Sequence, residues 1–565
     1  MFPHLSSREH SRRLLAVGWA LVAAVPLAFI GSQVIEASRN IAFQDELDTA
    51  IDFLVRLDAG AGWNEIFRRI FALSNEHRTA TSRLLFAASY WLTGTVNFHV
   101  IGAIGNLFIL AACGILIAAV GTIERRIRLG VVLAFLTFQL GNFENFLWSG
   151  ASIDHFQVVM LAVGAFALLA RNSRGAAAGA AGLAGLATFT LAHGSVTWLV
   201  GAAMLGQQRR WRRLALWSLA AALVLLGFLQ GFAANPGHQI PALTVESALR
   251  IGHYWLALIG APLAFGHSQA ATALGAGGVA ALGWVAWRRT WVREPVAIAA
   301  IAFAIISLGL VAYGRAEIAA GQIASRYIVL GTLVWSLLCF LALEAWTDPV
   351  RPYRLLGWCV PALFVFNFSA NAGYALRAED FVEARDRAAL RFKQYGVDGR
   401  GQTRLHPQDG HADVLLREAE ARGIYRLPRL CFEAEVPEAT PSTQMIGYVD
   451  ENMITASAIS LGGWAMLPGC ESERGQVHVI LRSAQRSFTF TTITVKRPDV
   501  AQAYREPRWR LCGFRFVILR FRVPIDDYQV GLLITEGDRT EYLMTDQWVR
   551  LAHPNPDAPV RFNTL

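Results

Sequence analysis

The chain has 565 residues, of which 54% are hydrophobic and 16% are charged, and its mean hydropathy is +0.37. Soluble globular domains carry about 25% charged residues, so this composition excludes an ordinary soluble protein and indicates an integral membrane protein. The formal net charge of +9 comes mainly from arginines in short runs between apolar segments. This distribution is typical of membrane topology signals, so we expect a lipid bilayer and no nucleic acid as partner.

Eleven apolar segments approach the length of about 20 residues that a helix needs to cross a bilayer. They lie near residues 14–32, 99–121, 129–148, 155–171, 176–191, 194–207, 214–232, 268–287, 295–313, 326–346 and 354–374. The fifth and sixth are short, and TLAHGSVTW between them is typical of a polar turn within the bilayer. We therefore predict an α-helical polytopic domain over residues 1–375. No small-residue cleavage site follows the first span, so we expect this span to stay as a membrane anchor and not to be removed as a signal peptide.

Short arginine runs decide the expected orientation, because basic loops of membrane proteins stay in the cytoplasm. With a cytoplasmic N-terminus, all of these runs fall inside: ERRIR at 124–128, RNSR at 171–174, RRWRR at 209–213, RRTWVR at 288–293 and RPYR at 351–354. The assignment requires the apolar pieces 79–96 and 250–266 to be half inserted or to lie on the outer face. Eleven spans then place the C-terminus in the periplasm of a bacterial inner membrane.

From about residue 376 the composition becomes that of a soluble α+β domain. Two amphipathic patterns predict a helical linker over residues 376–440. Beyond it, runs such as VHVILRSA and SFTFTTITV alternate apolar and polar residues between turns, which predicts an antiparallel β-sandwich over residues 441–565. Cys431, Cys470 and Cys512 are an odd number, so at most one disulfide can form among them, in an oxidising compartment.

Carboxylates crowd into IAFQDELDTAID, at the start of the first outer loop over residues 33–98. Long loops that contain their own helices are often functional. Apolar residues at helical spacing in AIDFLVRL and EIFRRIFAL indicate helices on the lipid surface. This explains Asp48, Asp52 and Asp58 as solvated side chains. Asp45 and Glu46 precede this periodic stretch, at the expected bilayer boundary, where ionised groups are usually functional or paired.

These elements resemble the membrane glycosyltransferases of the GT-C fold, among them lipid A aminoarabinose transferase and the protein mannosyltransferases. The resemblance rests on QDE directly after the first span, on two interfacial helices, and on an NEHR turn before a half-buried helix that ends in Gly. It implies that Asp45 and Glu46 are the catalytic acidic pair. NEHR replaces the HxPL motif of the family, and Glu76, His77 and Arg78 become candidates for substrate binding.

The family also carries a second acidic residue on the outer loop after the first basic inner loop. In GNFENFLWSGASIDHF, Asp154 is the match, Glu144 is the competing residue, and His155 is an adjacent candidate for substrate binding. The implied donor is a sugar on polyprenyl phosphate, and the implied acceptor is an envelope glycan or lipid. One carboxylate, Asp45, would take the acceptor proton while phosphate leaves from the opposite face, so the reaction inverts configuration. Asp154 would orient the acceptor or hold a divalent cation with Asp45.

The outer sequence AYGRAEIAAGQIASRYIVL contains Arg315 and Arg326, against the positive-inside tendency. A functional explanation is bidentate contact with the donor phosphate, with the Tyr327 hydroxyl nearby. In the alternative explanation Arg326 snorkels at a helix start and Arg315 pairs with Glu317. The segments SRY, ENFLW, RPDVA and CGF also resemble those of a group of related bacterial membrane proteins that end in a β-sandwich.

The leading hypothesis is therefore a periplasmic, inverting glycosyltransferase in which a metal is optional. Three alternatives stay open: a flippase or exporter of a lipid-linked glycan, a polymerase or ligase that acts on diphosphate-linked glycans, and a non-catalytic envelope assembly protein. A flippase predicts charged residues along several spans, whereas the charges here gather at span ends. A polymerase predicts more outer arginines, and an assembly protein tolerates the loss of Asp45.

Overall fold

The computed structural model describes residues 7–74, 76–171, 173–232, 244–287, 294–317, 322–347, 353–395, 404–408, 410–427, 439–455, 458–469, 476–484, 486–520, 523–536 and 539–551. The RRTWVR run, part of RPYR, and the cysteines Cys431 and Cys470 lie outside these ranges. Cys512 is a buried free thiol.

The chain forms two compact units, residues 1–383 with 406–426, and residues 384–405 with 427–565. This division differs from the predicted one, because helix α17 (Arg354–Tyr395) runs through the expected boundary at residue 376 without a break. The predicted linker is also divided, since its part around α18 (His411–Ala421) packs with the first outer loop.

Eight helical segments in the described residues are long and apolar enough to cross a membrane. They are α1 (Ser7–Ala37), α5 (Phe98–Ala119), the run from α8 (Ser149–Ala151) through η3 (Ser152–Phe156) to α9 (Gln157–Ala170), α12 (Trp211–Leu229), α14 (Ser268–Trp287), α15 (Pro295–Arg315), η7 (Ser325–Tyr327) with α16 (Ile328–Trp346), and α17. A ninth candidate is the pair α6 (Ile123–Thr137) and η2–α7 (Leu140–Asn142, Phe143–Leu147), bent by 59°. The chain is thus a multi-pass membrane protein, with fewer candidate spans than the eleven predicted.

Two predicted spans are shorter helices. The segments near 176–191 and 194–207 form α10 (Arg174–Thr190) and α11 (Val196–Gln207), with 17 and 12 residues. At a rise of 1.5 Å per residue they measure about 25 and 18 Å, less than the bilayer core of about 30 Å. The 3₁₀ turn η4 (Ala192–Ser195) occupies the place of the predicted polar turn.

The two apolar pieces that were not expected to cross are also short helices. They form α4 (Ala80–Thr93) and α13 (Val245–Gly260), the latter followed by η5 (Ala261–Leu263). With 14 and 16 residues, neither α4 nor α13 is among the candidate spans. Their expected failure to cross the bilayer agrees with these lengths.

The first outer loop contains η1 (Leu47–Asp52), α2 (Phe53–Asp58) and α3 (Trp63–Ile70). Helix α3 exposes Trp63 and Phe67, as a helix on a lipid surface would. The same prediction is wrong for η1 and α2, because apolar side chains such as Ile51 and Leu54 are fully buried in protein. The segment that bears the carboxylates is therefore fixed by tertiary packing.

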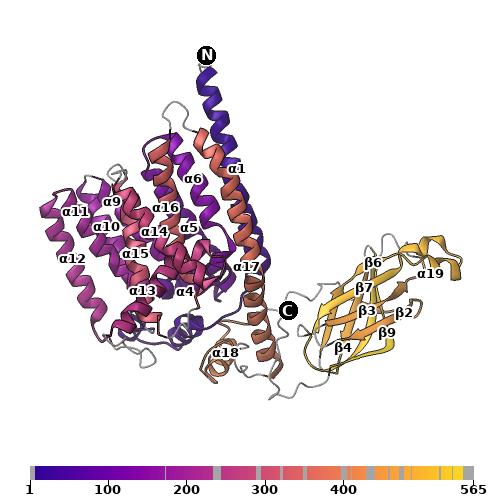
Figure 1. Cartoon of the computed structure of the whole chain (residues 1–565). Coiled ribbons are helices and arrows are strands. Elements are labelled where there is room, and N and C mark those ends of the chain that lie inside the picture. Colours follow the sequence, from indigo (N-terminus) through magenta and orange to yellow (C-terminus); the bar gives the residue numbers. More distant parts are fainter. Residues whose placement is uncertain are drawn as a thin grey trace, which may run out of the picture. The chain divides into compact units, whose positions relative to one another are not determined.

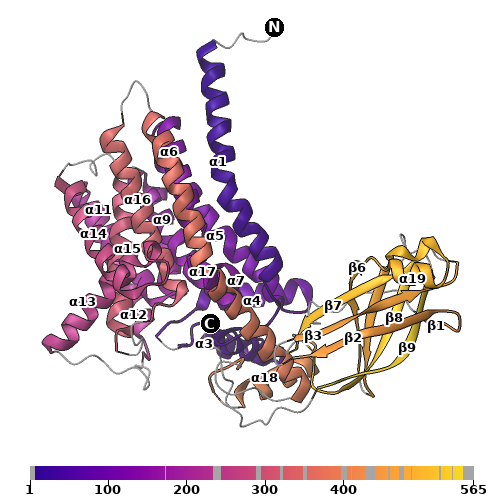
Figure 2. The same cartoon turned by 45° about the vertical axis from the view of Figure 1, so that its right-hand side comes forward.

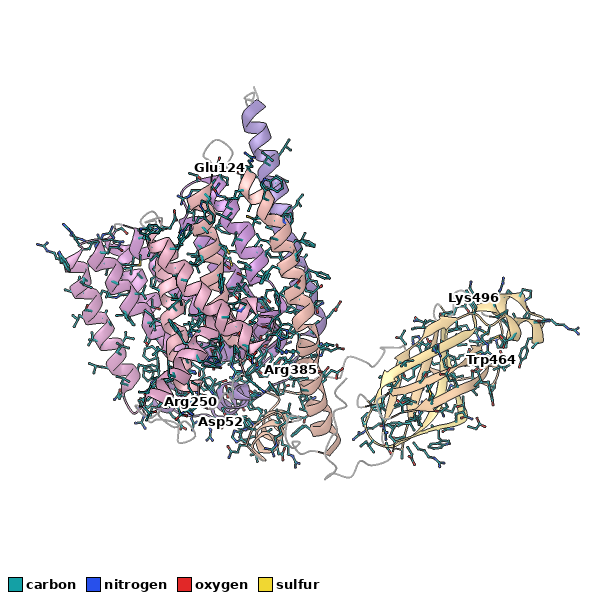
Figure 3. The ribbon with its side chains drawn as sticks, in the orientation of Figure 1. Asp52, Glu124, Arg250, Arg385, Trp464 and Lys496 are labelled. Atoms are coloured by element: carbon teal, nitrogen blue, oxygen red, sulfur yellow. The ribbon has the colours of Figure 1, made fainter. Side chains whose placement is uncertain are left out.

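The first loop and the start of α1 lie at opposite ends of the helical unit (Figures 1 and 2). Glu124 lies at the end where the chain begins, whereas Asp52 and Arg250 lie at the other end (Figure 3). The Tyr425 hydroxyl donates to the carbonyl of Asn40, just beyond α1, at 2.9 Å. If α1 crosses the bilayer, the residues around α18 lie on the side opposite the N-terminus, however many short helices cross.

The C-terminal unit contains two sheets, with strand orders β1-β9-β8-β4-β5 and β2-β3-β7-β6. The strands are β1 (Thr440–Pro441), β2 (Ile446–Ile454), β3 (Ala458–Met466), β4 (Gln476–Arg482), β5 (Ser487–Thr491), β6 (Ile493–Val495), β7 (Gly513–Leu519), β8 (Asp527–Glu536) and β9 (Arg539–Arg550), with helices α19 (Pro498–Ala503) and η9 (Pro507–Leu511) before β7. Inward residues of both sheets, such as Leu461, Phe516 and Leu532, share one core. The predicted C-terminal β-sandwich is confirmed, and its strand pairs are antiparallel apart from β1 with β9.

An ion-pair network joins α6, α15 and α16 at their ends near the ERRIR run. Glu344 accepts from Arg125 at 2.6 Å and pairs with Arg128 at 2.6 Å, and Arg125 also pairs with Glu294. Only 13% of the Glu344 side chain is exposed, so solvent screens these charges weakly. The arginines of this run therefore also hold three helices together.

We expect Glu344→Ala to destabilise the protein by about 3–5 kcal/mol, because removing one partner of a buried ion pair leaves its charge poorly compensated. Thermal unfolding of the detergent-solubilised chain measures the effect. The matched control is Glu246→Ala, whose 3.4 Å pair with Arg250 is largely exposed and is worth at most about 1 kcal/mol. Equal shifts for the two variants would contradict a stabilising role of the network.

Candidate functional site

Glu46 is a buried carboxylate that fixes the start of the first outer loop. Its Oε2 accepts from the amide of Phe43 at 2.9 Å, and its Oε1 accepts from the amide of Gly150 at 2.6 Å and from the Ser149 hydroxyl. A Cβ at position 150 would lie 3.1 Å from Glu46 Cγ, so only glycine allows this close approach without rearrangement. Glu46 thus connects the QDE segment to the turn that leads to Asp154.

Asp45, the residue before Glu46, is exposed, although protein surrounds most of it. A solute can therefore reach a carboxyl group whose surroundings are mainly protein. Burial raises the pKa of Asp45 above its ordinary value, and the charges of Arg326 and Arg315 act against this rise. Gln44, directly before Asp45, has a φ of 49° in the left-handed region, a strain that concentrates at functional sites.

Glu144 and Arg326 form one unit rather than two independent candidates. The Arg326 guanidinium binds Glu144 Oε1 at 3.1 Å, and the Arg326 amide donates to Oε2 at 2.8 Å. The guanidinium also lies 5.3 Å from the Tyr327 ring centroid and 6.0 Å from that of Trp148. Arg326 is therefore paired and partly stacked, and the alternative in which it only snorkels is wrong.

Asp154 lies in η3 and accepts a hydrogen bond from the Ser82 hydroxyl of α4. Its charge interacts with those of Arg83 and Asp45. Arg83 donates to the carbonyls of Ala72 at 2.6 Å and Arg78 at 2.8 Å, and burial lowers its pKa to about 10. Asp154 therefore interacts with the same charged region as Asp45, and its hydrogen-bond donor comes from α4, which is not among the candidate spans.

The NEHR turn has three differently used side chains. Glu76 lies 4.0 Å from Arg315, so the expected pair of Arg315 with Glu317 is wrong, and Glu317 instead pairs with Arg250 at 3.0 Å. His77 Nδ1 accepts from the amide of Ala192 at 3.2 Å, which leaves the proton on Nε2.

Burial, with the charges of Arg315 and Arg326, lowers the pKa of His77 to about 4, so its ring is neutral at pH 7. Arg78 donates to three backbone carbonyls, those of Phe71, Phe228 and Gln230. Its donors therefore serve the fold, and this geometry favours a structural role over the substrate-binding role predicted for Arg78.

Two buried imidazoles adjoin this region. His155 packs edge to face against the Tyr327 ring, with 5.5 Å between centroids, and stacks at 6.3 Å against His193. His155 Nδ1 and His193 Nε2 are buried polar atoms without a hydrogen bond to protein. Buried polar atoms normally have a hydrogen-bond partner, because leaving them without one destabilises the fold. These two nitrogens can therefore bind a ligand or water beside Tyr327.

Most of the residues singled out in the sequence thus belong to one electrostatic neighbourhood at the end of the bundle away from the N-terminus. Asp45, Arg315 and Arg326 interact there, and Asp154 interacts with Asp45. Among the described residues, the group with metal-ligand geometry is Asp48, His406 and His411, to which neither Asp45 nor Asp154 belongs. The sequence does not identify these two histidines and Tyr425, since 358 to 385 residues separate them from the loop residues that they contact.

No protein-family model, curated protein or solved structure matches this chain.

We expect Tyr425→Phe to destabilise the first outer loop. The buried Tyr425 hydroxyl donates to the carbonyl of Asn40 and accepts from the amide of Ala42 at 3.0 Å, and Phe leaves both groups without this partner. An unsatisfied buried polar group costs about 1–3 kcal/mol. Hydrogen exchange should show faster exchange in residues 40–54, and unchanged protection there would contradict the assigned contact.

Proposed function

We propose that the chain is a membrane glycosyltransferase of the GT-C type, which transfers a sugar from polyprenyl phosphate to an envelope glycan or lipid on the periplasmic side. The observation that supports it best is an accessible carboxyl, Asp45, beyond the end of α1 and within electrostatic range of Arg315 and Arg326. Transfer from a phosphate-linked sugar requires a base for the acceptor hydroxyl and cations for the leaving phosphate.

In the proposed reaction the acceptor oxygen attacks the anomeric carbon of the sugar. Asp45 takes the hydroxyl proton as the new C–O bond forms. The bond between the anomeric carbon and the phosphate oxygen breaks, its electron pair stays on polyprenyl phosphate, and the configuration inverts. Since Asp45 is ionised before the step and neutral after it, charge and protons balance.

Arg326 and Arg315 are suited to the phosphate. A guanidinium offers several donors in a fixed plane, so Arg326 can bind Glu144 through one edge and a phosphate oxygen through another. Arg315 approaches Glu76 only at 4.0 Å, a distance at which an anion of higher charge competes readily. Neutral His77 and the Tyr327 hydroxyl supply further hydrogen-bonding groups, and Asp154 would orient the acceptor.

We expect Asp45→Asn to lower transfer by about 10²–10⁴-fold, the usual contribution of a general base. The amide keeps the shape of the side chain but cannot take a proton. The measurement is the mass shift of the surface glycan in cells that express each variant at equal protein level. The matched control is Asp52→Asn on the same loop, where a half-buried carboxylate pairs with Arg56 at 2.7 Å.

Normal glycan in Asp45→Asn cells would remove Asp45 from the mechanism and favour a non-catalytic envelope protein. Stability gives a second distinction. Because its folded-state pKa is raised, ionised Asp45 lowers stability as pH rises through its pKa. Asp45→Asn should therefore leave the Tm unchanged or higher, so that lost transfer cannot be attributed to misfolding.

The pH dependence of transfer should follow the ionisation of Asp45. Only the carboxylate accepts a proton, and burial raises the pKa of this group. We expect kcat/KM to fall with acidification at a pH above the ordinary range of an aspartate. A purified enzyme assay with a short-chain polyprenyl phosphate sugar measures this profile, and an acid limb at the ordinary aspartate pKa would exclude Asp45 as the base.

A further inference from the structure

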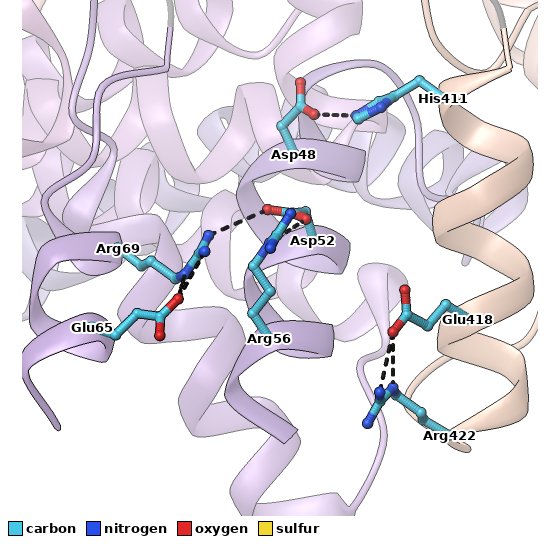
Figure 4. A network of polar contacts seen from close by, with 8 residues as sticks. All are labelled: Asp48, Asp52, Arg56, Glu65, Arg69, His411, Glu418 and Arg422. Carbon is cyan, nitrogen blue, oxygen red and sulfur yellow. Dashed lines mark hydrogen bonds and ion pairs between the residues drawn. The ribbon is translucent and has the colours of Figure 1, made fainter. Parts of the chain in front are cut away.

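Asp48 joins two histidines from a distant part of the chain. Its Oδ1 lies 2.6 Å from His411 Nε2, and its Oδ2 lies 3.2 Å from His406 Nε2. The two imidazole centroids are 4.5 Å apart. Figure 4 shows the contact between Asp48 and His411, and it also shows that Asp52, Arg56 and Arg69 form a separate ion-pair group farther along the loop.

Local structure directs these side chains toward one point. Asp48 lies in the first turn of η1, and His411 is the first residue of α18. Gly410 precedes it with a φ of 71°, a left-handed conformation that glycine adopts without strain, and this turn directs the start of α18. His406 lies in the short segment before that turn and is buried.

The donor set suits a transition metal. Two imidazoles and one carboxylate form a three-ligand set that Zn²⁺ accepts, with a fourth position open for water. Ligand atoms of the three residues all lie within 4.8 Å of one another. Tetrahedral zinc with bonds of about 2.0–2.1 Å separates its ligands by about 3.4 Å, so small side-chain shifts suffice.

The site is open on one side. Asp48 and His411 expose 43% and 28% of their side chains, whereas His406 exposes 8%. An ion can therefore enter from solvent while one ligand is held rigidly in protein. The same contacts describe a hydrogen-bonded Asp with two histidines when no metal is bound, and titration with Zn²⁺ distinguishes the two states.

Metal binding replaces the hydrogen bonds between Asp48 and the two imidazoles, and it changes one further contact. His406 Nδ1 accepts from the amide of Gln408 at 3.1 Å, so in the metal-free chain the ring proton lies on Nε2 and points to Asp48. A metal at Nε2 requires the other tautomer of the neutral ring, with the proton on Nδ1, so the Gln408 contact is lost. Loss of this bond and of the two hydrogen bonds between Asp48 and the imidazoles is offset by two metal–nitrogen bonds and one metal–oxygen bond.

We propose that Asp48, His406 and His411 form a divalent transition-metal site, matched to Zn²⁺, that fastens the segment around α18 to the first outer loop. The inference does not rest on the proposed transferase activity, because Asp45 is not among the ligands. In this proposal Asp48, His406 and His411 stabilise the loop. On a solvated surface helix, Asp48 would have no such role.

The test uses the full-length chain in detergent, stripped with a chelator and then titrated with Zn²⁺ in competition with a chromophoric chelator. We expect one Zn²⁺ per chain, and a dissociation constant that rises by about 100-fold or more in Asp48→Asn, His406→Ala and His411→Ala. His99→Ala is the matched control, since this exposed histidine lies on the same end of the bundle and its ring contacts the Ser38 hydroxyl at 2.9 Å.

A second measurement keeps the result independent of folding defects. Zn²⁺ should raise the Tm of the unaltered chain and of His99→Ala by several degrees, and should leave the Tm of His411→Ala unchanged. Asp48→Asn preserves side-chain shape and should remain monodisperse in size-exclusion chromatography. Zn²⁺ binding that is equal in the unaltered chain and all three ligand variants, or no binding at micromolar Zn²⁺, would overturn the proposal and leave a hydrogen-bonded clasp.

Discussion

The buried carboxylate of Glu46 is the interaction on which the rest of the site depends. It accepts hydrogen bonds from Phe43, Ser149 and Gly150, and so ties the end of α1 to the turn that begins η3. A buried charge is tolerable only when such donors compensate it. Its neighbour Asp45 is exposed and interacts with the charges of Arg326 and Asp154. Two adjacent residues thus differ in role: Glu46 is fixed by hydrogen bonds, and Asp45 is accessible to a solute.

The second constraint comes from residues 406–426, the last segment of the helical unit along the chain. The segment around α18 covers the first outer loop through Tyr425, His406 and His411, and Arg422 adds an ion pair with Asp58 at 3.3 Å. These contacts hold the loop at Asn40, Asp48 and Asp58. The loop is therefore held between the bundle and a returning segment, which explains why a helix expected to rest on lipid buries its apolar face in protein.

Charges in this chain fall into two groups with different consequences. Arg78 and Arg83 donate hydrogen bonds to backbone carbonyls. Arg125 and Arg128 form ion pairs with Glu344 at helix ends. These residues therefore maintain the fold. Arg315, Arg326 and Asp45 keep solvent access or weaker pairing, and they are the groups that a sugar phosphate and an acceptor would meet. The network around Glu344 maintains the fold at one end of the bundle, whereas Arg78 and Arg83 do so beside the candidate site at the other end.

The sequence by itself determined the membrane class, the positions of the long apolar helices and the C-terminal β-sandwich, because hydrophobic length and alternation are local properties. It also singled out Asp45, Asp154 and Arg326, since charges at span ends stand out against an apolar background. Tertiary structure alone decided that Arg315 pairs with Glu76, and that His406 and His411 meet Asp48. Those contacts join residues far apart in the chain, and local pattern holds no information about which distant side chains the packing brings together.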